Sequence, residues 1–140
     1  MEKLKPYSAL ILALGGFILF VMGLYFVFIR PPLLPEDLRY MQTTSMVINN
    51  SAPGLAVWLQ KVFWVMGSYI LTTGLLTIFI ALTSFRKRTQ GAFPIVAIAG
   101  MSSIGFMTIV NFIINSNFKW ILLVFTLPWL IALMLYRLHK

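Results

Sequence analysis

Four long apolar stretches constrain this chain more than any other feature of its sequence. Each is close to or longer than the roughly 20 mostly apolar residues that a helix needs to cross a hydrocarbon core of about 30 Å. They cover, approximately, residues 7–29, 58–85, 92–115 and 118–136. The last two connections are short, which predicts one membrane domain over residues 1–140, an all-α integral membrane protein folded as a four-transmembrane-helix up-down bundle.

The composition supports a membrane protein and excludes several kinds of chemistry. Hydrophobic residues make up 60% of the chain and charged residues 10%, whereas a soluble domain carries about 25% charged residues. The absence of cysteine excludes disulfides, thiol nucleophiles and cysteine-bound metals. His139 is the single histidine, so paired imidazole ligands are missing as well. We therefore expect neither a metal nor a cofactor.

The basic residues predict how the bundle is oriented. With four spans, both termini lie on the same side as the 86–91 connection, and Lys and Arg are retained on the cytoplasmic side. That side carries seven basic residues: Lys3, Lys5, Arg86, Lys87, Arg88, Arg137 and Lys140. The opposite side carries four: Arg30, Arg39, Lys61 and Lys119. This predicts an N-in, C-in protein, and without a eukaryotic targeting signature we expect a bacterial cytoplasmic (inner) membrane.

We attribute the net charge of +8 to the same basic residues that predict the topology. Basic residues beside membrane spans also attract anionic lipid. No basic patch interleaved with aromatic residues indicates nucleic-acid binding. The expected partner is therefore the lipid bilayer, not a nucleic acid.

The outer loop, about residues 30–57, is the only substantial segment outside the spans. Pro35-Glu36-Asp37 is a typical helix start, with proline in the first turn followed by acids. Apolar and polar residues then alternate as far as about Ile48. The pattern predicts a short amphipathic helix at the outer membrane surface.

Two of the three acids in the chain fall in this predicted helix. Glu36 and Asp37 stand beside Arg39 and Tyr40, and paired carboxylates could serve proton transfer or cation binding. The alternative is that acids in a first turn complement the helix dipole, which needs no ligand.

Small residues predict where the helices approach each other. Gly16 and Gly23 in the first span, and Gly67 and Gly74 in the second, are each spaced by seven and so share one helix face. Ala99 and Ser103 form a small-xxx-small pair in the third span. These residues indicate seams inside the bundle or, alternatively, an oligomer interface.

A polar stripe is expected along the third span. Thr108, Asn111 and Asn115 are spaced by three and four residues, which places them on one helix face. Amides are costly against lipid, so they should meet another helix, water or a ligand. The stripe therefore indicates either a lined ligand pocket or hydrogen bonds between helices.

Three functional hypotheses follow from these patterns. The first is a small non-enzymatic accessory or scaffolding subunit that packs against a larger membrane protein, with a homo-oligomer also possible. The second is a binder or carrier of an apolar small molecule, a lipid or quinone, in the outer half of the bundle, with Asn111 and Asn115 as polar contacts. The third is a lipid-modifying enzyme that uses Glu36, Asp37 and Tyr40.

Overall fold

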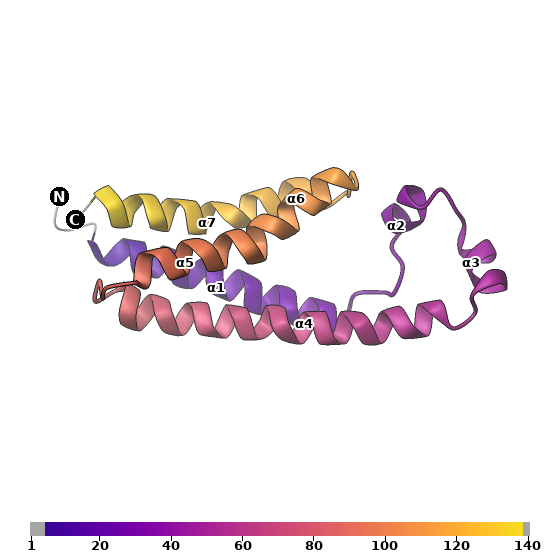
Figure 1. Cartoon of the computed structure of the whole chain (residues 1–140), viewed down its shortest axis with the longest axis horizontal. Coiled ribbons are helices and arrows are strands. Elements are labelled where there is room, and N and C mark those ends of the chain that lie inside the picture. Colours follow the sequence, from indigo (N-terminus) through magenta and orange to yellow (C-terminus); the bar gives the residue numbers. More distant parts are fainter. Residues whose placement is uncertain (1–4, 139–140) are drawn as a thin grey trace.

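The computed structural model describes residues 5–138, with side chains from Tyr7 onward, and this part of the chain is helical without strands. Four long helices lie alongside one another in alternating directions (Figure 1). They are α1 (Lys5–Phe28), α4 (Leu55–Ile80) with its π-helical extension η2 (Ala81–Phe85), the composite α5 (Ala92–Gly100), η3 (Met101–Gly105) and α6 (Phe106–Ile113), and α7 (Lys119–Leu138). All four are long and apolar enough to span a membrane, which confirms the predicted all-α bundle.

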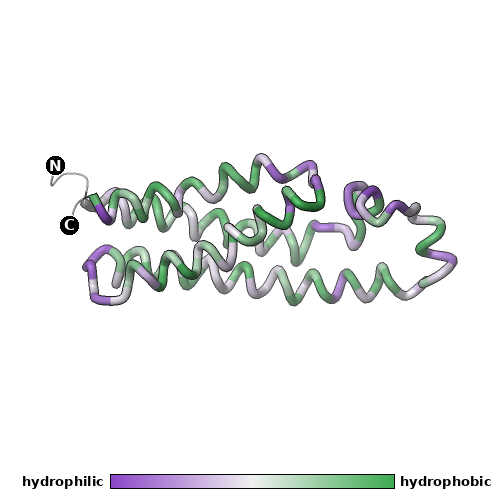
Figure 2. The backbone as a smooth tube through the Cα atoms, turned by 45° about the horizontal axis from the view of Figure 1, so that its top comes forward, coloured by the Kyte–Doolittle hydropathy of each residue, from purple (hydrophilic) through white to green (hydrophobic). Residues whose placement is uncertain are grey.

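The polar residues gather at the two ends of the bundle. Figure 2 shows hydrophobic residues along the four helices and hydrophilic ones in the connections. One end holds the start of α1, the 86–91 connection and the end of α7 (Figure 1), and we call it the terminal end. The other holds the 29–54 loop and the turn between α6 and α7, and we call it the loop end. Lys3 and Lys140, used to predict orientation, and His139 lie outside the described residues.

The amphipathic helix of the loop is shorter than predicted. It begins at Pro35, as expected, but α2 (Pro35–Tyr40) ends after six residues instead of reaching Ile48. Gln42 adopts a left-handed backbone conformation with φ of 53°, which stops the helix. The Thr44 hydroxyl then accepts a hydrogen bond from the Val47 N–H at 3.4 Å and starts α3 (Ser45–Ser51).

Helices α1 and α4 pack backbone against backbone along the four predicted glycines. A Cβ added to Gly23 would lie 2.5 Å from the Leu71 nitrogen, and one added to Gly16 would lie 2.9 Å from the Gly74 carbonyl oxygen. Both positions are closer than real Cβ atoms come to their neighbours. Gly67 similarly faces the Gly23 carbonyl. The two pairs therefore form one seam inside the chain.

The largest buried side chain of α7 packs against two glycines of other helices. Trp129, 3% exposed, follows Pro128 within α7 and lies against Gly15 of α1 and Gly100 of α5. At the terminal end Arg88 donates a hydrogen bond to the Tyr136 carbonyl at 2.9 Å and covers the Tyr136 ring. The core at this end is therefore closed by aromatic and cationic contacts.

The third helix departs from α4 as it approaches the loop end. It leaves the 86–91 connection beside α4 and crosses toward the start of α7 (Figure 1). The principal packing partners are α1 with α4 and α1 with α7, while α6 packs against α7. A π segment adds a residue to the helical turn and often marks a functional site, and η3 lies where this divergence begins.

Candidate functional site

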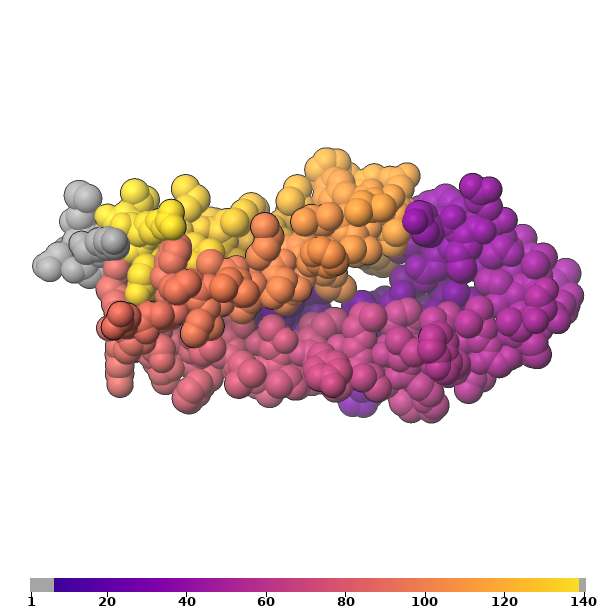
Figure 3. All heavy atoms as spheres, in the orientation of Figure 1, coloured from indigo at the N-terminus to yellow at the C-terminus, as the bar shows by residue number. Residues whose placement is uncertain are grey.

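The divergence of α4 and α6 leaves a large cavity in the loop-end half of the bundle. Its volume is about 940 Å³. Figure 3 shows the hollow between α4 and α6, on the side of the bundle. The opening therefore lies between two helices that are long and apolar enough to span a membrane. Aromatic residues supply much of the wall: Tyr25, Phe26, Phe63, Tyr69, Phe106, Phe118 and Phe125.

Arg30 closes the loop end of the cavity. Its guanidinium carbon lies 3.4 Å from the centre of the Phe63 ring, and the residue is 8% exposed. It donates to the Pro31 carbonyl at 2.9 Å and forms an ion pair with Asp37 at 3.4 Å. Burial lowers the pKa of Arg30 from its ordinary value, and the nearby Asp37 carboxylate opposes that shift. The cavity thus ends in a buried cation stacked on an aromatic ring.

The two loop acids have different partners. Asp37 accepts a hydrogen bond from the Leu34 N–H at 2.9 Å, so it caps the start of α2 while it also pairs with Arg30. Glu36 is 3% exposed and accepts a hydrogen bond from the Ser116 hydroxyl at 3.2 Å. Ser116 in turn accepts one from the Phe118 N–H at 3.0 Å. Asp37 therefore stabilises its own helix, whereas Glu36 reaches across the bundle.

Residues 30–40, which we call the strap, connect the two sides of the bundle at the loop end. The strap is tied to α1 and α4 through the Arg30 carbonyl, which accepts from the Gln60 amide at 3.3 Å. On the other side Arg39 donates to the Asn115 carbonyl at 3.1 Å and to the Asn117 side chain at 3.3 Å. The strap thus covers the end of the cavity and leaves its lateral opening free (Figure 3).

The four loop residues predicted as a polar site do not converge. Glu36 and Asp37 line the cavity, whereas Arg39 lies outside it and contacts the α6–α7 turn. Tyr40 is 59% exposed and is also absent from the lining. The structure therefore groups the acids with Arg30 instead of with Tyr40.

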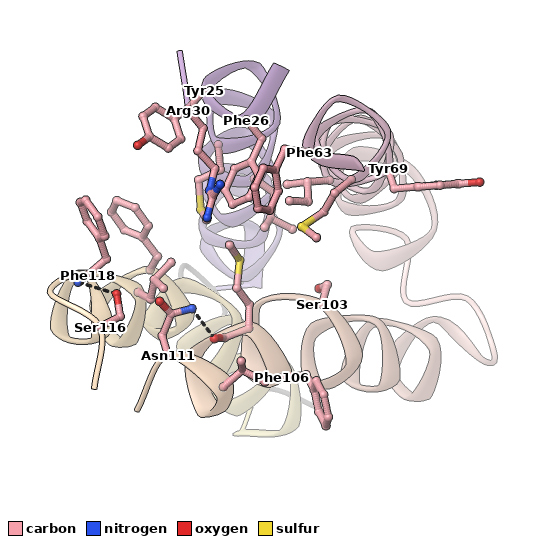
Figure 4. Close-up of a pocket in the computed structure, with 18 of the residues that line it drawn as sticks. Tyr25, Phe26, Arg30, Phe63, Tyr69, Ser103, Phe106, Asn111, Ser116 and Phe118 are labelled. Atoms are coloured by element: carbon pink, nitrogen blue, oxygen red, sulfur yellow. Dashed lines mark hydrogen bonds between the residues drawn. The ribbon is translucent and has the colours of Figure 1, made fainter. Parts of the chain in front are cut away.

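The predicted polar stripe is divided among three environments. Asn111 lines the cavity and donates its amide to the Met107 carbonyl at 2.9 Å (Figure 4). Thr108 is buried away from the lining and donates to the Ile104 carbonyl. Asn115 is not on the helix, because α6 ends at Ile113 and Asn115 turns the chain with φ of 52°; its side chain accepts from Lys119. The expectation of one face with three polar residues is corrected accordingly.

Ala99 and Ser103 lie where the third helix changes its winding. The Ser103 hydroxyl donates to the Ala99 carbonyl at 2.5 Å, across the boundary between α5 and η3. Ala99 packs against the buried core, and Ser103 lines the cavity. The pair therefore contributes to the inner packing of the helix and to the cavity wall.

Arg30 and Ser116 are site residues that sequence reasoning missed. In the sequence Arg30 stands out only as a basic residue on the outer side, and Ser116 only as part of a short connection. A usable signal for Arg30 was its position six and seven residues before Glu36 and Asp37, in a chain with three acids. No local pattern pairs Ser116 with Glu36, since 80 residues separate them.

The site offers hydrogen-bonding and charged groups, not a metal centre. Among the described residues, no three His, Cys, Asp or Glu side chains are grouped as a metal site requires. No protein-family model matches the sequence, and neither a curated protein nor a solved structure is significantly similar to it. The chemistry of the site therefore rests on its geometry.

Proposed function

We propose that this small integral membrane protein binds an amphiphile of the bilayer, a lipid or quinone, in the cavity between α4 and α6. The supporting observation is a cavity of about 940 Å³ that is apolar along its walls, opens sideways and ends in the buried Arg30 and Glu36. Binding pockets for small molecules have this pattern of apolar walls with a few placed polar groups.

The glycines favour this function over that of an accessory subunit. The subunit hypothesis expects small residues on the lipid-facing surface, ready to contact another chain. Gly16, Gly23, Gly67 and Gly74 instead contact each other's helices within one chain. The enzyme hypothesis is also less favoured, because Tyr40 is 59% exposed and lies outside the cavity lining that contains both acids.

The charge pattern supports an orientation for the proposed binder. At the terminal end Arg86 and Lys87 are exposed, and positive charge of this kind is retained in the cytoplasm. With that end inside, the cavity opens into the outer leaflet. A bacterial cytoplasmic membrane remains our proposal for the location.

Native mass spectrometry of the full chain, released from nanodiscs of mixed phospholipids with added ubiquinone, tests the proposal. We expect the wild-type chain to retain an amphiphile. Met107→Trp fills the cavity from α6 and should reduce the retained fraction by about tenfold. Met101→Trp is the matched control, because Met101 is 68% exposed and lies outside the lining.

The two substitutions make the outcomes decisive. Retention lost with Met107→Trp and kept with Met101→Trp supports binding in the cavity. Equal retention by both variants, or no retained amphiphile on the wild-type chain, contradicts the proposed function.

A further inference from the structure

Two charged side chains at the end of the cavity are buried but incompletely hydrogen-bonded. Glu36 accepts its hydrogen bond from Ser116, and its carboxylate has no other hydrogen-bond partner among the described residues. A guanidinium carries five N–H donors, and the described partners of Arg30 are the Pro31 carbonyl and Asp37. Both residues line the cavity, so both can offer the remaining capacity to a ligand.

The ion pair of Arg30 with Asp37 leaves Arg30 available. The 3.4 Å distance between Arg30 Nη2 and Asp37 Oδ2 exceeds the 2.7–2.9 Å of a strong charge-assisted hydrogen bond. The Asp37 side chain is 23% exposed, so water screens its charge. Figure 4 shows the Arg30 guanidinium pointing into the cavity, toward the wall that carries Asn111.

Of the three charged residues in the lining, the two that are less than a tenth exposed balance one to one, and the third, Asp37, is partly exposed and paired with Arg30. Glu36 contributes one negative charge and Arg30 one positive charge, both at the same end of a mainly apolar space. A ligand with a single charge would satisfy one of them and leave the other unpaired, which is costly in a low dielectric. A headgroup that carries one charge of each sign satisfies both.

We infer, on the basis of the proposed function, that the ligand is a zwitterionic phospholipid with a primary ammonium, its phosphate at Arg30 and its ammonium at Glu36. The arginine fork suits phosphate oxygens. An ammonium donates N–H groups to the free carboxylate oxygen, which a trimethylammonium cannot do. The acyl chains would lie against the aromatic walls and extend out through the opening between α4 and α6.

The test is lipid competition on the full chain. Wild-type protein is placed in nanodiscs of equimolar phosphatidylethanolamine, phosphatidylcholine and phosphatidylglycerol with identical acyl chains, plus ubiquinone, and the retained adducts are identified by native mass spectrometry. We expect phosphatidylethanolamine to be enriched by about tenfold over either other phospholipid, as charged hydrogen bonds of ordinary strength provide. Glycerophosphoethanolamine, the headgroup without acyl chains, should not displace it.

Two variants test whether Glu36 binds the ammonium of the headgroup and Arg30 its phosphate. Glu36→Gln keeps the shape of the side chain and its bond with Ser116, and should abolish the preference for ethanolamine over choline. Arg30→Gln should lower retention of both zwitterionic lipids. Lys87→Gln removes one charge from the exposed terminal end and should change neither ratio.

Each outcome bears on the inference. Equal retention of the three phospholipids, a preference for ubiquinone, or an unchanged ethanolamine preference in Glu36→Gln overturns the headgroup assignment but leaves binding in the cavity standing. Displacement by glycerophosphoethanolamine overturns the assignment to a membrane lipid. Loss of all adducts from the wild-type chain removes the proposed function itself.

Discussion

The adjacent acids Glu36 and Asp37 bond to partners at very different separations along the chain. Asp37 bonds to the Leu34 N–H of its own helix and to Arg30, whereas Glu36 bonds to Ser116 in the α6–α7 turn. Both acids line the cavity, but at successive helical positions the Asp37 carboxylate bonds within the strap and the Glu36 carboxylate bonds to the α6–α7 turn. The helix-dipole interpretation therefore suits Asp37, and Glu36 is the acid to test for binding.

Removing the Ser116 hydroxyl should destabilise the fold through Glu36. Ser116→Ala leaves the buried Glu36 carboxylate without its hydrogen bond, which should cost about 1–3 kcal/mol in the free energy of unfolding. Chemical unfolding in mixed micelles, followed by circular dichroism, measures the change. Ser102→Ala is the control, because that hydroxyl bonds to carbonyls of its own helix and should change stability by less than about 0.5 kcal/mol.

A double-mutant cycle separates the Glu36 contact from other effects of Ser116. If the charge of Glu36 causes the loss, Glu36→Gln should recover part of it in the Ser116→Ala background. Strict additivity of the two substitutions would contradict the coupling.

At the scale of elements, the α1–α4 seam depends on the absence of side chains. Gly74→Ala places a Cβ against the backbone of Phe20 and should destabilise the chain by about 1–3 kcal/mol, as overpacking does. Gly54→Ala is a matched control, since nothing lies within 4 Å of its Cβ position. The same unfolding measurement compares them, and equal stability of the two variants would refute close packing at this seam.

The strap should open more often when its hydrogen bonds to the α6–α7 turn are removed. Arg39→Ala deletes the hydrogen bonds to Asn115 and Asn117, and such exposed contacts contribute about 0.2–1 kcal/mol. Amide hydrogen exchange in α2 should then be faster by up to about fivefold. Mass spectrometry of deuterated peptides measures this, with Arg86→Ala at the terminal end as the control. Unchanged exchange in α2 would show that Arg39 does not hold the strap.

The elements differ in how far sequence could predict them. The start of α2 was predictable because Pro35-Glu36-Asp37 is a local signal, and the four spans because apolar length is also local. The π segments η2 and η3 were not predictable, because Met101–Gly105 has the same apolar and small residues as ordinary helix. The predicted third span extends to Asn115, whereas α6 ends at Ile113, so Asn115 lies beyond the helix.

At the scale of the whole molecule, orientation is the property most directly tested in cells. The sequence contains no cysteine, so single cysteines can be introduced without background. We expect Asn117→Cys, at the loop end, to react with a membrane-impermeant maleimide in intact cells. Lys87→Cys, at the terminal end, should react only after permeabilisation. The reverse pattern would invert the proposed topology.

From sequence, a ligand pocket in the outer half of the bundle was only one of two interpretations of the polar stripe, and the cavity between α4 and α6 could not be located. It arises because α6 packs on α7 and leaves α4, and that choice of partners depends on contacts between residues far apart in the chain. Glu36 meets Ser116 across 80 residues, and Arg39 meets Asn115 across 76. Sequence identified Asn111, Glu36 and Asp37 individually, but their common cavity is a property of tertiary packing.

Helix α4 with its extension is longer than a hydrocarbon core is thick. Leu55–Phe85 is 31 residues long, about 46 Å at about 1.5 Å per residue, whereas the hydrocarbon core measures about 30 Å. Near the start of α4, Lys61 lies 3.6 Å from the centre of the Trp64 ring, a pair suited to the membrane–water interface. Gln60 and Arg30 meet beside them, just past the end of α1. The phospholipid that we propose as the ligand would therefore enter by lateral diffusion alone, with its headgroup staying at the level of its neighbours' headgroups.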